Sequence, residues 1–267
     1  MRVALFIPCF VDQFYPEVGK AMVAVLRRVG VEVCFPSEQT CCGQPAFNTG
    51  YWDEARTLAK RYCEIFNKYD AIVSPSGSCT AMVRNFYPEL LSLSCHSERS
   101  EEPRNNLAPM ADHSEILRFA QDDKQNESVA RVCANTFEFS EFLVKKLSLA
   151  DVGAKFPAKV TYHDSCHTLR ELRLKEEPRT LLRAVQGLEL VEMTEAETCC
   201  GFGGTFSVKF PTISTAMDDV KCQSIVATGA QYVVSVDSSC LMQIGGWLRR
   251  RNLPVQTKHL AEVLAQT

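Results

Sequence analysis

Cysteine is the residue type in this chain whose number and spacing point most directly to chemistry. The chain holds thirteen cysteines among 267 residues, so at least one has no intrachain partner. The apolar run at residues 1–11 lacks a cleavage-site pattern and predicts a buried strand rather than a signal peptide. We therefore expect a cytoplasmic protein in a reducing compartment. There, cysteines serve metals or redox chemistry rather than disulfides.

Eight of the cysteines recur as two sets of four. The sequence Thr-Cys-Cys-Gly occurs at residues 40–43 and again at 198–201. In each half, one repeated cysteine lies before this motif and another lies after it, and each of these follows an apolar run. The offsets between equivalent cysteines are 157, 158 and 161 residues, which predicts an internal repeat. The repeated cysteines are Cys9, Cys41, Cys42 and Cys79 in the first copy, and Cys166, Cys199, Cys200 and Cys240 in the second.

Four thiolates can hold a tetrahedral zinc ion or a [4Fe–4S] cluster. Zinc sites usually take their cysteines from pairs about two to four residues apart. Here Cys9 lies 32 residues before Cys41, and Cys42 lies 37 residues before Cys79. The adjacent pair suits separate irons of a multinuclear cluster better than one small ion. We expect one iron–sulfur cluster per repeat and leave open whether it is of the [4Fe–4S] type. A zinc site, and catalytic or structural thiols, are the alternatives.

The pattern Cys-x31-Cys-Cys-Gly, followed by a cysteine after a Ser-x-x spacing, recurs in the second half with one more intervening residue and Asp237 in place of the Ser. It resembles the cysteine-rich CCG domain. That domain occurs in the B subunit of heterodisulfide reductase and in the iron–sulfur subunit of glycolate oxidase. The closer resemblance is to the lactate utilization protein A family. It rests on the strings at residues 76–83, 161–167 and 197–211, and it covers nearly the whole chain except residues 92–128.

The resemblance implies an iron–sulfur electron-transfer subunit of a complex that oxidises L-lactate to pyruvate. It also implies partners, namely a ferredoxin-type iron–sulfur protein and a third small subunit. The alternatives are a related redox subunit of the glycolate oxidase or heterodisulfide reductase type and, in another class, a zinc-stabilised interaction module. No catalytic residue is assigned. The loop at 201–204 departs from the dinucleotide pattern G-x-G-x-x-G at Phe206, which argues against nucleotide binding.

The wider CCG pattern has a fifth cysteine, which this chain replaces with Ser76 in one half and Asp237 in the other. Either side chain could supply an oxygen ligand, or neither. His163 and His167 flank Cys166 and could donate to a sulfide or shuttle a proton. The alternative for both histidines is loop packing beside a helix start.

Short β-rich runs alternate with helical patterns outside residues 92–128, which predicts parallel sheets. The expected helices include Trp52–Lys68 and Thr212–Thr228. The expected strands are Val3–Ile7, Val31–Phe35, Ala71–Ser74, Val129–Ala134, Lys159–Tyr162, Leu188–Glu192, Tyr232–Val236 and Val255–Lys258. We predict two tandem α/β CCG domains, residues 1–150 and 151–267, related by a pseudo-twofold axis. Cysteines that follow strands should then gather at the carboxyl edges of the sheets.

Residues 92–128 form a Ser-, Asn- and charge-rich insertion with little apolar periodicity, and we expect it to be disordered and dispensable. Cys95, His96 and His113 lie inside it and are discounted as ligands. Cys63 and Cys222 are expected to pack in helices, and Cys34 and Cys133 in strands. The net charge of −3 argues against nucleic acid as a partner, and no apolar run is long enough for a membrane span.

Overall fold

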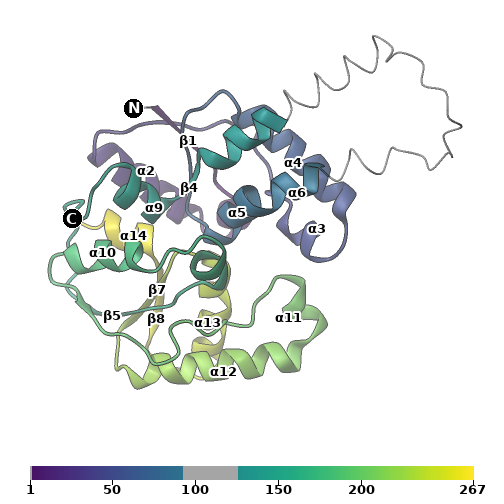
Figure 1. The fold of residues 1–267 in the computed structure, drawn as a ribbon. Coiled ribbons are helices and arrows are strands. Elements are labelled where there is room, and N and C mark those ends of the chain that lie inside the picture. The colour runs from purple at the N-terminus through teal and green to yellow at the C-terminus, as the bar shows by residue number, and fades with distance from the viewer. Residues whose placement is uncertain (1, 93–125) are drawn as a thin grey trace, which may run out of the picture.

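The computed structural model describes residues 2–92 and 126–267, and it contains two four-stranded parallel sheets (Figure 1). The first sheet has the order β2-β1-β3-β4, and the second repeats it as β6-β5-β7-β8. The strands are β1 (Arg2–Leu5), β2 (Glu32–Cys34), β3 (Ile72–Ser74), β4 (Thr136–Glu138), β5 (Lys159–Tyr162), β6 (Glu189–Leu190), β7 (Tyr232–Ser235) and β8 (Gln256–His259). The predicted fold class, two tandem parallel-sheet α/β units, is confirmed.

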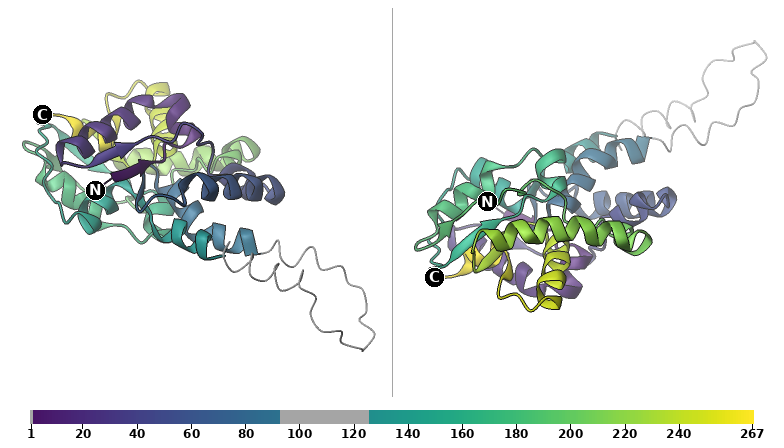
Figure 2. Two further views of the ribbon diagram at one scale, coloured as in Figure 1. Left: turned by 90° about the horizontal axis from the view of Figure 1, so that it is seen from above. Right: turned by 90° about the horizontal axis from the view of Figure 1, so that it is seen from below.

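Helices connect the strands in both halves and cover the sheets (Figures 1 and 2). Those of the first half are α1 (Cys9–Phe14), α2 (Pro16–Arg28), α3 (Gln44–Asn48), α4 (Trp52–Phe66), α5 (Gly77–Ala81), the π-helix η1 (Met82–Phe86), α6 (Tyr87–Ser92), a helix at 126–134, α9 (Phe139–Glu141) and the π-helix η2 (Phe142–Lys146). Those of the second half are the π-helix η3 (His167–Glu171), α10 (Glu176–Ala184), α11 (Thr205–Lys209), α12 (Pro211–Ala227), α13 (Ser238–Arg250) and α14 (Leu260–Ala265).

The central strands are buried on both faces, which explains their continuous apolar runs. Successive side chains of a strand point to opposite faces. Accordingly, Val3 and Leu5 of β1 join one apolar cluster, whereas Ala4 and Phe6 join another on the opposite face. The register pairs Ala4 with Cys34 on one side and with Ile72 on the other, so β1 lies at the centre of its sheet.

The two halves share one apolar core. Leu26 of α2 belongs to the same buried cluster as Val160 of β5 and Leu260 of α14. Helix α2 packs directly on α14. The Arg28 guanidinium donates hydrogen bonds across the halves to the carbonyl oxygens of Leu264, at 2.9 Å, and Ala265, at 2.7 Å. The predicted division between residues 150 and 151 therefore separates two sheets, but the two halves do not have independent cores. The position of the domain boundary stays a prediction.

The strand predicted at Val129–Ala134 is wrong, because residues 126–134 form a helix and β4 begins only at Thr136. Val129, Val132 and Cys133 are the buried positions. Their spacing of three and four residues is the helical period, which places one face of the helix on the core. Cys133 is thus a helical core residue, not a strand residue.

The other predicted strands and the two predicted helices overlap observed elements. Most of the insertion predicted at 92–128, including Cys95, His96 and His113, lies outside the described residues. Its two described ends belong to α6 and to the helix at 126–134. Within 2–92 and 126–267, no helix has the length and apolar character needed to cross a membrane.

Candidate functional site

All eight predicted cysteines line a single cavity between the two halves. In each half they come from three segments that follow strands. Cys9 begins α1 directly after β1, Cys79 lies in α5 after β3, and the adjacent pair lies in the loop between β2 and α3. The second half repeats this arrangement with β5, β7 and the loop between β6 and α11. The carboxyl edges of both sheets therefore face one another across the cavity.

The strand order explains why the cysteines meet there. β1 lies between β2 and β3, so the chain leaves the carboxyl end of the sheet in opposite directions at this point. Such a switch point opens a crevice at the strand ends, where ligands of open α/β sheets bind. β5 has the same place between β6 and β7. The expectation that strand-end cysteines converge is thus met in the geometry of each half.

The thiols of the first half are close enough to share hydrogen bonds. Hydrogen bonds from the thiols of Cys42 and Cys9 lower the pKa of Cys41 to about 3. The same bonds, together with burial, raise the pKa values of Cys9 and Cys42. The backbone N–H of Gly43 also donates to Cys41 Sγ, at 3.4 Å. The cysteines of this set therefore act directly on one another.

The second half has the same arrangement. Hydrogen bonds from Cys166 and Cys200 lower the pKa of Cys199 to about 2, and the backbone N–H of Gly201 donates to Cys199 Sγ at 3.4 Å. In both adjacent pairs the first cysteine is half-buried and the second is buried. The two sites therefore share the same pattern of thiol interactions, although Cys9 is exposed and its counterpart Cys166 is half-buried.

Glycine after each cysteine pair is a structural requirement. Gly43 and Gly201 both have φ of 85°, in the left-handed region that favours glycine. A Cβ atom on Gly201 would lie 2.5 Å from the carbonyl oxygen of Ser214, inside contact distance. The turn at glycine lets both cysteines of a pair face one site, although neighbours on a strand would point apart.

The donor set fits a metal–sulfur centre in each half. Four sulfur donors converge there, and soft thiolate donors select zinc or iron–sulfur clusters over hard cations. Twelve described cysteines are free, so none of the eight is taken up in a disulfide. Each metal–sulfur centre would be held by the four cysteines of one half. This assignment of ligands is a prediction.

Ser76 and Asp237, which replace the fifth cysteines, bind each other and their surroundings. Ser76 Oγ accepts from the backbone N–H of Cys79 at 3.3 Å and so caps α5. The Asp237 carboxylate accepts from the backbone N–H of Ser78 at 2.9 Å and from the Ser165 hydroxyl at 3.1 Å. Asp237 thus caps a helix of the other half and joins the two sulfur sites.

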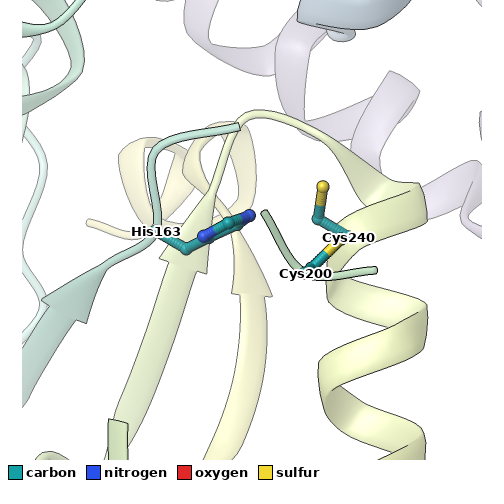
Figure 3. Close-up of side chains that lie close together, drawn as sticks. All are labelled: His163, Cys200 and Cys240. Carbon is teal, nitrogen blue, oxygen red and sulfur yellow. The ribbon is translucent and has the colours of Figure 1, made fainter. Parts of the chain in front are cut away.

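The two predicted histidines lie in different surroundings. His167 lies between the halves, where its Nε2 is 3.4 Å from the Gln44 amide nitrogen and its Nδ1 is 3.6 Å from Cys166 Sγ. His163 is fully buried, and neither ring nitrogen has a hydrogen-bond partner among the described residues. Its ring is directed toward Cys200 and Cys240, and the potential ligand atoms of these three residues lie within 4.8 Å of one another (Figure 3).

Sequence reasoning missed Lys221, a fully buried residue of α12. Its Nζ donates to the carbonyl oxygen of Ala196 at 3.0 Å and also to that of Glu195. Burial lowers its pKa to about 8, while the thiols of Cys200 and Cys240 oppose that shift. The signal in the sequence was a lysine directly before Cys222, at a position where the first repeat has Tyr62.

Comparison with protein families identifies the repeat. The model of the cysteine-rich CCG domain matches residues 3–84 and 160–245. Lactate utilization protein A of Bacillus pumilus is 46% identical over 264 residues, covering 99% of this chain and 99% of that protein. The protein of the same name from an Exiguobacterium strain is 44% identical, covering 98% of this chain and 96% of its own length.

Among solved structures, a hypothetical protein from Helicobacter pylori has a similar fold, with a TM-score of 0.51 at 10% sequence identity. The match covers 98% of this chain and 48% of that longer chain. At this identity the likeness concerns the fold alone.

Proposed function

The chain belongs to the lactate utilization protein A family and carries two cysteine-rich CCG domains. From that premise we propose that it is the iron–sulfur electron-transfer subunit of a complex that oxidises L-lactate to pyruvate. The observation that carries the proposal is the convergence of four cysteines per half on one cavity. Each set would hold one iron–sulfur cluster, which supplies one-electron storage when bound.

The residues of the chain hold and shield these groups. The cysteines that follow β1 and β3 come from helix starts, and the pair comes from a glycine turn, so rigid elements fix all four sulfurs. Phe10 and Phe202 meet across the halves at 5.7 Å between ring centroids, and both line the cavity. These rings would cover part of the cavity beside the sulfur sites. Cys9 is the exposed member of its set, so electrons would enter or leave at this edge.

We propose that lactate itself is oxidised on another subunit. Oxidation of L-lactate to pyruvate releases two electrons and two protons. Two one-electron sites in this chain match that number, with a ferredoxin-type iron–sulfur protein as the next carrier. The sequence has no dinucleotide loop for a hydride, and we propose that the hydride acceptor resides elsewhere in the complex.

Lactate is favoured over glycolate or a disulfide as the source of electrons because the matched relatives carry the name lactate utilization protein A. The test is lactate-dependent dye reduction by the anaerobically purified, iron-loaded chain, first alone and then with the products of its neighbouring genes. We expect no turnover by the chain alone and turnover with the full set. A complex carrying Cys42→Ala should lose that turnover.

Two results would contradict the proposal. Robust lactate oxidation by the purified chain alone would mean that it is a complete enzyme. Activity of the full set with glycolate or a disulfide, but not with lactate, would identify the related redox subunit instead.

A further inference from the structure

The two sulfur sites have different groups behind them, although their cysteines match. In the first half, the ring of Phe6 lies 4.8 Å from that of Tyr62, measured between centroids, and Tyr62 lies 5.5 Å from Tyr87. Phe6, Tyr62 and Tyr87 belong to the apolar cluster that contains Cys42 and Cys79. The Tyr87 hydroxyl donates to the Cys42 carbonyl oxygen at 2.9 Å, so it is not free to act on a sulfur.

The equivalent positions in the second half are His163 and Lys221. The backbone N–H of Phe6 donates to the Val73 carbonyl at 2.9 Å, and that of His163 donates to the Val234 carbonyl at 2.9 Å. These two hydrogen bonds link matching strands, β1 with β3 and β5 with β7. His163 therefore stands where the first half has Phe6.

Lys221 is matched to Tyr62 by a second pair of contacts. A Cβ on Gly43 would meet the backbone oxygen of Ala55, and one on Gly201 would meet that of Ser214. Tyr62 follows Ala55 by seven residues on α4, and Lys221 follows Ser214 by seven residues on α12. Two aromatic side chains behind one site are thus replaced by an imidazole and an ammonium group behind the other.

Both replacements favour negative charge at the second site. The potential of an iron–sulfur cluster rises with hydrogen bonds to its sulfurs and with nearby positive charge. The buried His163 ring has one N–H in its neutral form and no other partner among the described residues. Lys221 is fully buried and forms no salt bridge within the described parts of the chain. The carboxylates of Asp164 and Glu195 act on it only from beyond ion-pair distance.

The nearest buried carboxylates do not cancel this difference. Asp237 hydrogen-bonds to serines of both halves, so its charge acts on both sites. Asp164 pairs with the Arg179 guanidinium at 2.7 Å. The two sites therefore differ in hydrogen-bond donors and positive charge because of His163 and Lys221.

We infer that His163 and Lys221 make the second site the stronger electron acceptor, so that a single electron held by the chain resides on the cluster of Cys166, Cys199, Cys200 and Cys240. The inference rests on the proposed function, since it needs a cluster in each half. The step is a one-electron transfer from the reduced first site to the oxidised second site, and no bond or proton changes place.

The experiment is a redox titration of the anaerobically purified full chain with dithionite, followed by EPR. Wild-type protein should show two one-electron steps with separate midpoint potentials, which Cys42→Ala and Cys200→Ala assign to their halves. His163→Phe and Lys221→Met should each lower the second-site potential, making its reduction at least tenfold less favourable, a shift of about 59 mV for one electron. The first-site potential should not move and serves as the internal control. His163→Gln, which restores an N–H donor, should recover part of the shift.

The outcomes separate the inference from the proposed function. Wild-type protein without iron and sulfide would overturn the proposed function. Two clusters whose potentials are equal, or do not change in either variant, would overturn only the inference. Loss of second-site iron in His163→Phe with no shift in Lys221→Met would also overturn it, by making His163 a ligand. If His163→Phe does not fold, Lys221→Met still decides the direction.

Discussion

Asp237 joins the halves, and removing its carboxylate should destabilise the whole chain. The side chain is only 3% exposed. Its two oxygens accept from the Ser78 backbone N–H at 2.9 Å and from the Ser165 and Ser78 hydroxyls at 3.1 Å each. A hydrogen bond to a charged group contributes about 1.5–3 kcal/mol, and an orphaned buried donor costs about 1–3 kcal/mol. Asp237→Ala should therefore lower the free energy of unfolding by about 3–5 kcal/mol.

A milder substitution, Asp237→Asn, distinguishes loss of the charge from loss of the hydrogen bonds. Asn can keep its oxygen toward the Ser78 N–H and the Ser165 hydroxyl, and turn its amide nitrogen toward the Ser78 hydroxyl, which can rotate to accept. Asp237→Asn should therefore cost only about 1 kcal/mol. Asp53→Asn is the control, because the Asp53 side chain is 91% exposed and, among the described residues, pairs with Arg56 of its own helix alone.

Denaturant unfolding of the iron-loaded variants at one pH measures these differences. The expected order of stability is Asp53→Asn close to wild type, then Asp237→Asn, then Asp237→Ala. If Asp237→Ala unfolded at the same midpoint as Asp53→Asn, the carboxylate would not be joining the halves and the reasoning would fail.

Three further predictions concern residues outside the sulfur sites. Cys63→Ser places a hydroxyl in the core beside α4, where Cys63 is 7% exposed. It should lower the free energy of unfolding in urea by about 1–3 kcal/mol and leave the iron content at the wild-type level. Loss of iron would instead make Cys63 a ligand. Gly77→Ala should strongly destabilise the folded chain, because the new Cβ would lie 1.7 Å from Thr168 Oγ1. Gly246→Ala is the control, because its Cβ would meet nothing within 4 Å. Equal thermal unfolding midpoints for the two variants would refute the close contact at Gly77. Burial raises the pKa of Glu138 from 4.5 to about 8, so the folded chain binds this proton more tightly than the unfolded chain and loses stability as pH rises from about 4.5 to 8. Glu138→Gln should remove a decline of roughly 2 kcal/mol between pH 6 and pH 8, and an unchanged pH profile would contradict it.

The repeat offsets and the strand-end rule were sufficient to predict the two sheets and the gathering of the cysteines. The offsets compare equivalent residues of the two halves, and each cysteine follows a strand after a short stretch of loop or helix, so both signals can be read without knowing the fold. Val129–Ala134 was assigned to a strand because its β-branched residues outweighed a spacing that is helical. The strand β4 that follows it is only three residues long and has little signal of its own.

The features missed in the sequence depend on contacts between distant segments. Asp237 is the residue before α13, yet its carboxylate caps α5, more than a hundred residues earlier. Lys221 looks like an ordinary surface lysine until the alignment of the halves sets it opposite Tyr62. No single helix pattern predicts the core that α2 and α14 share, because it forms only when both sheets are in place.

The central claim is that each half holds an iron–sulfur cluster on its own four cysteines. Its most direct test is the iron, zinc and acid-labile sulfide content of the anaerobically purified chain, compared with Cys42→Ala and Cys200→Ala. The account predicts iron and sulfide in similar amounts in the wild type, with visible absorption that dithionite bleaches. Each variant should lose the iron and sulfide of the half that carries the substitution and retain those of the other half. Zinc in place of iron, with no sulfide, would contradict the account.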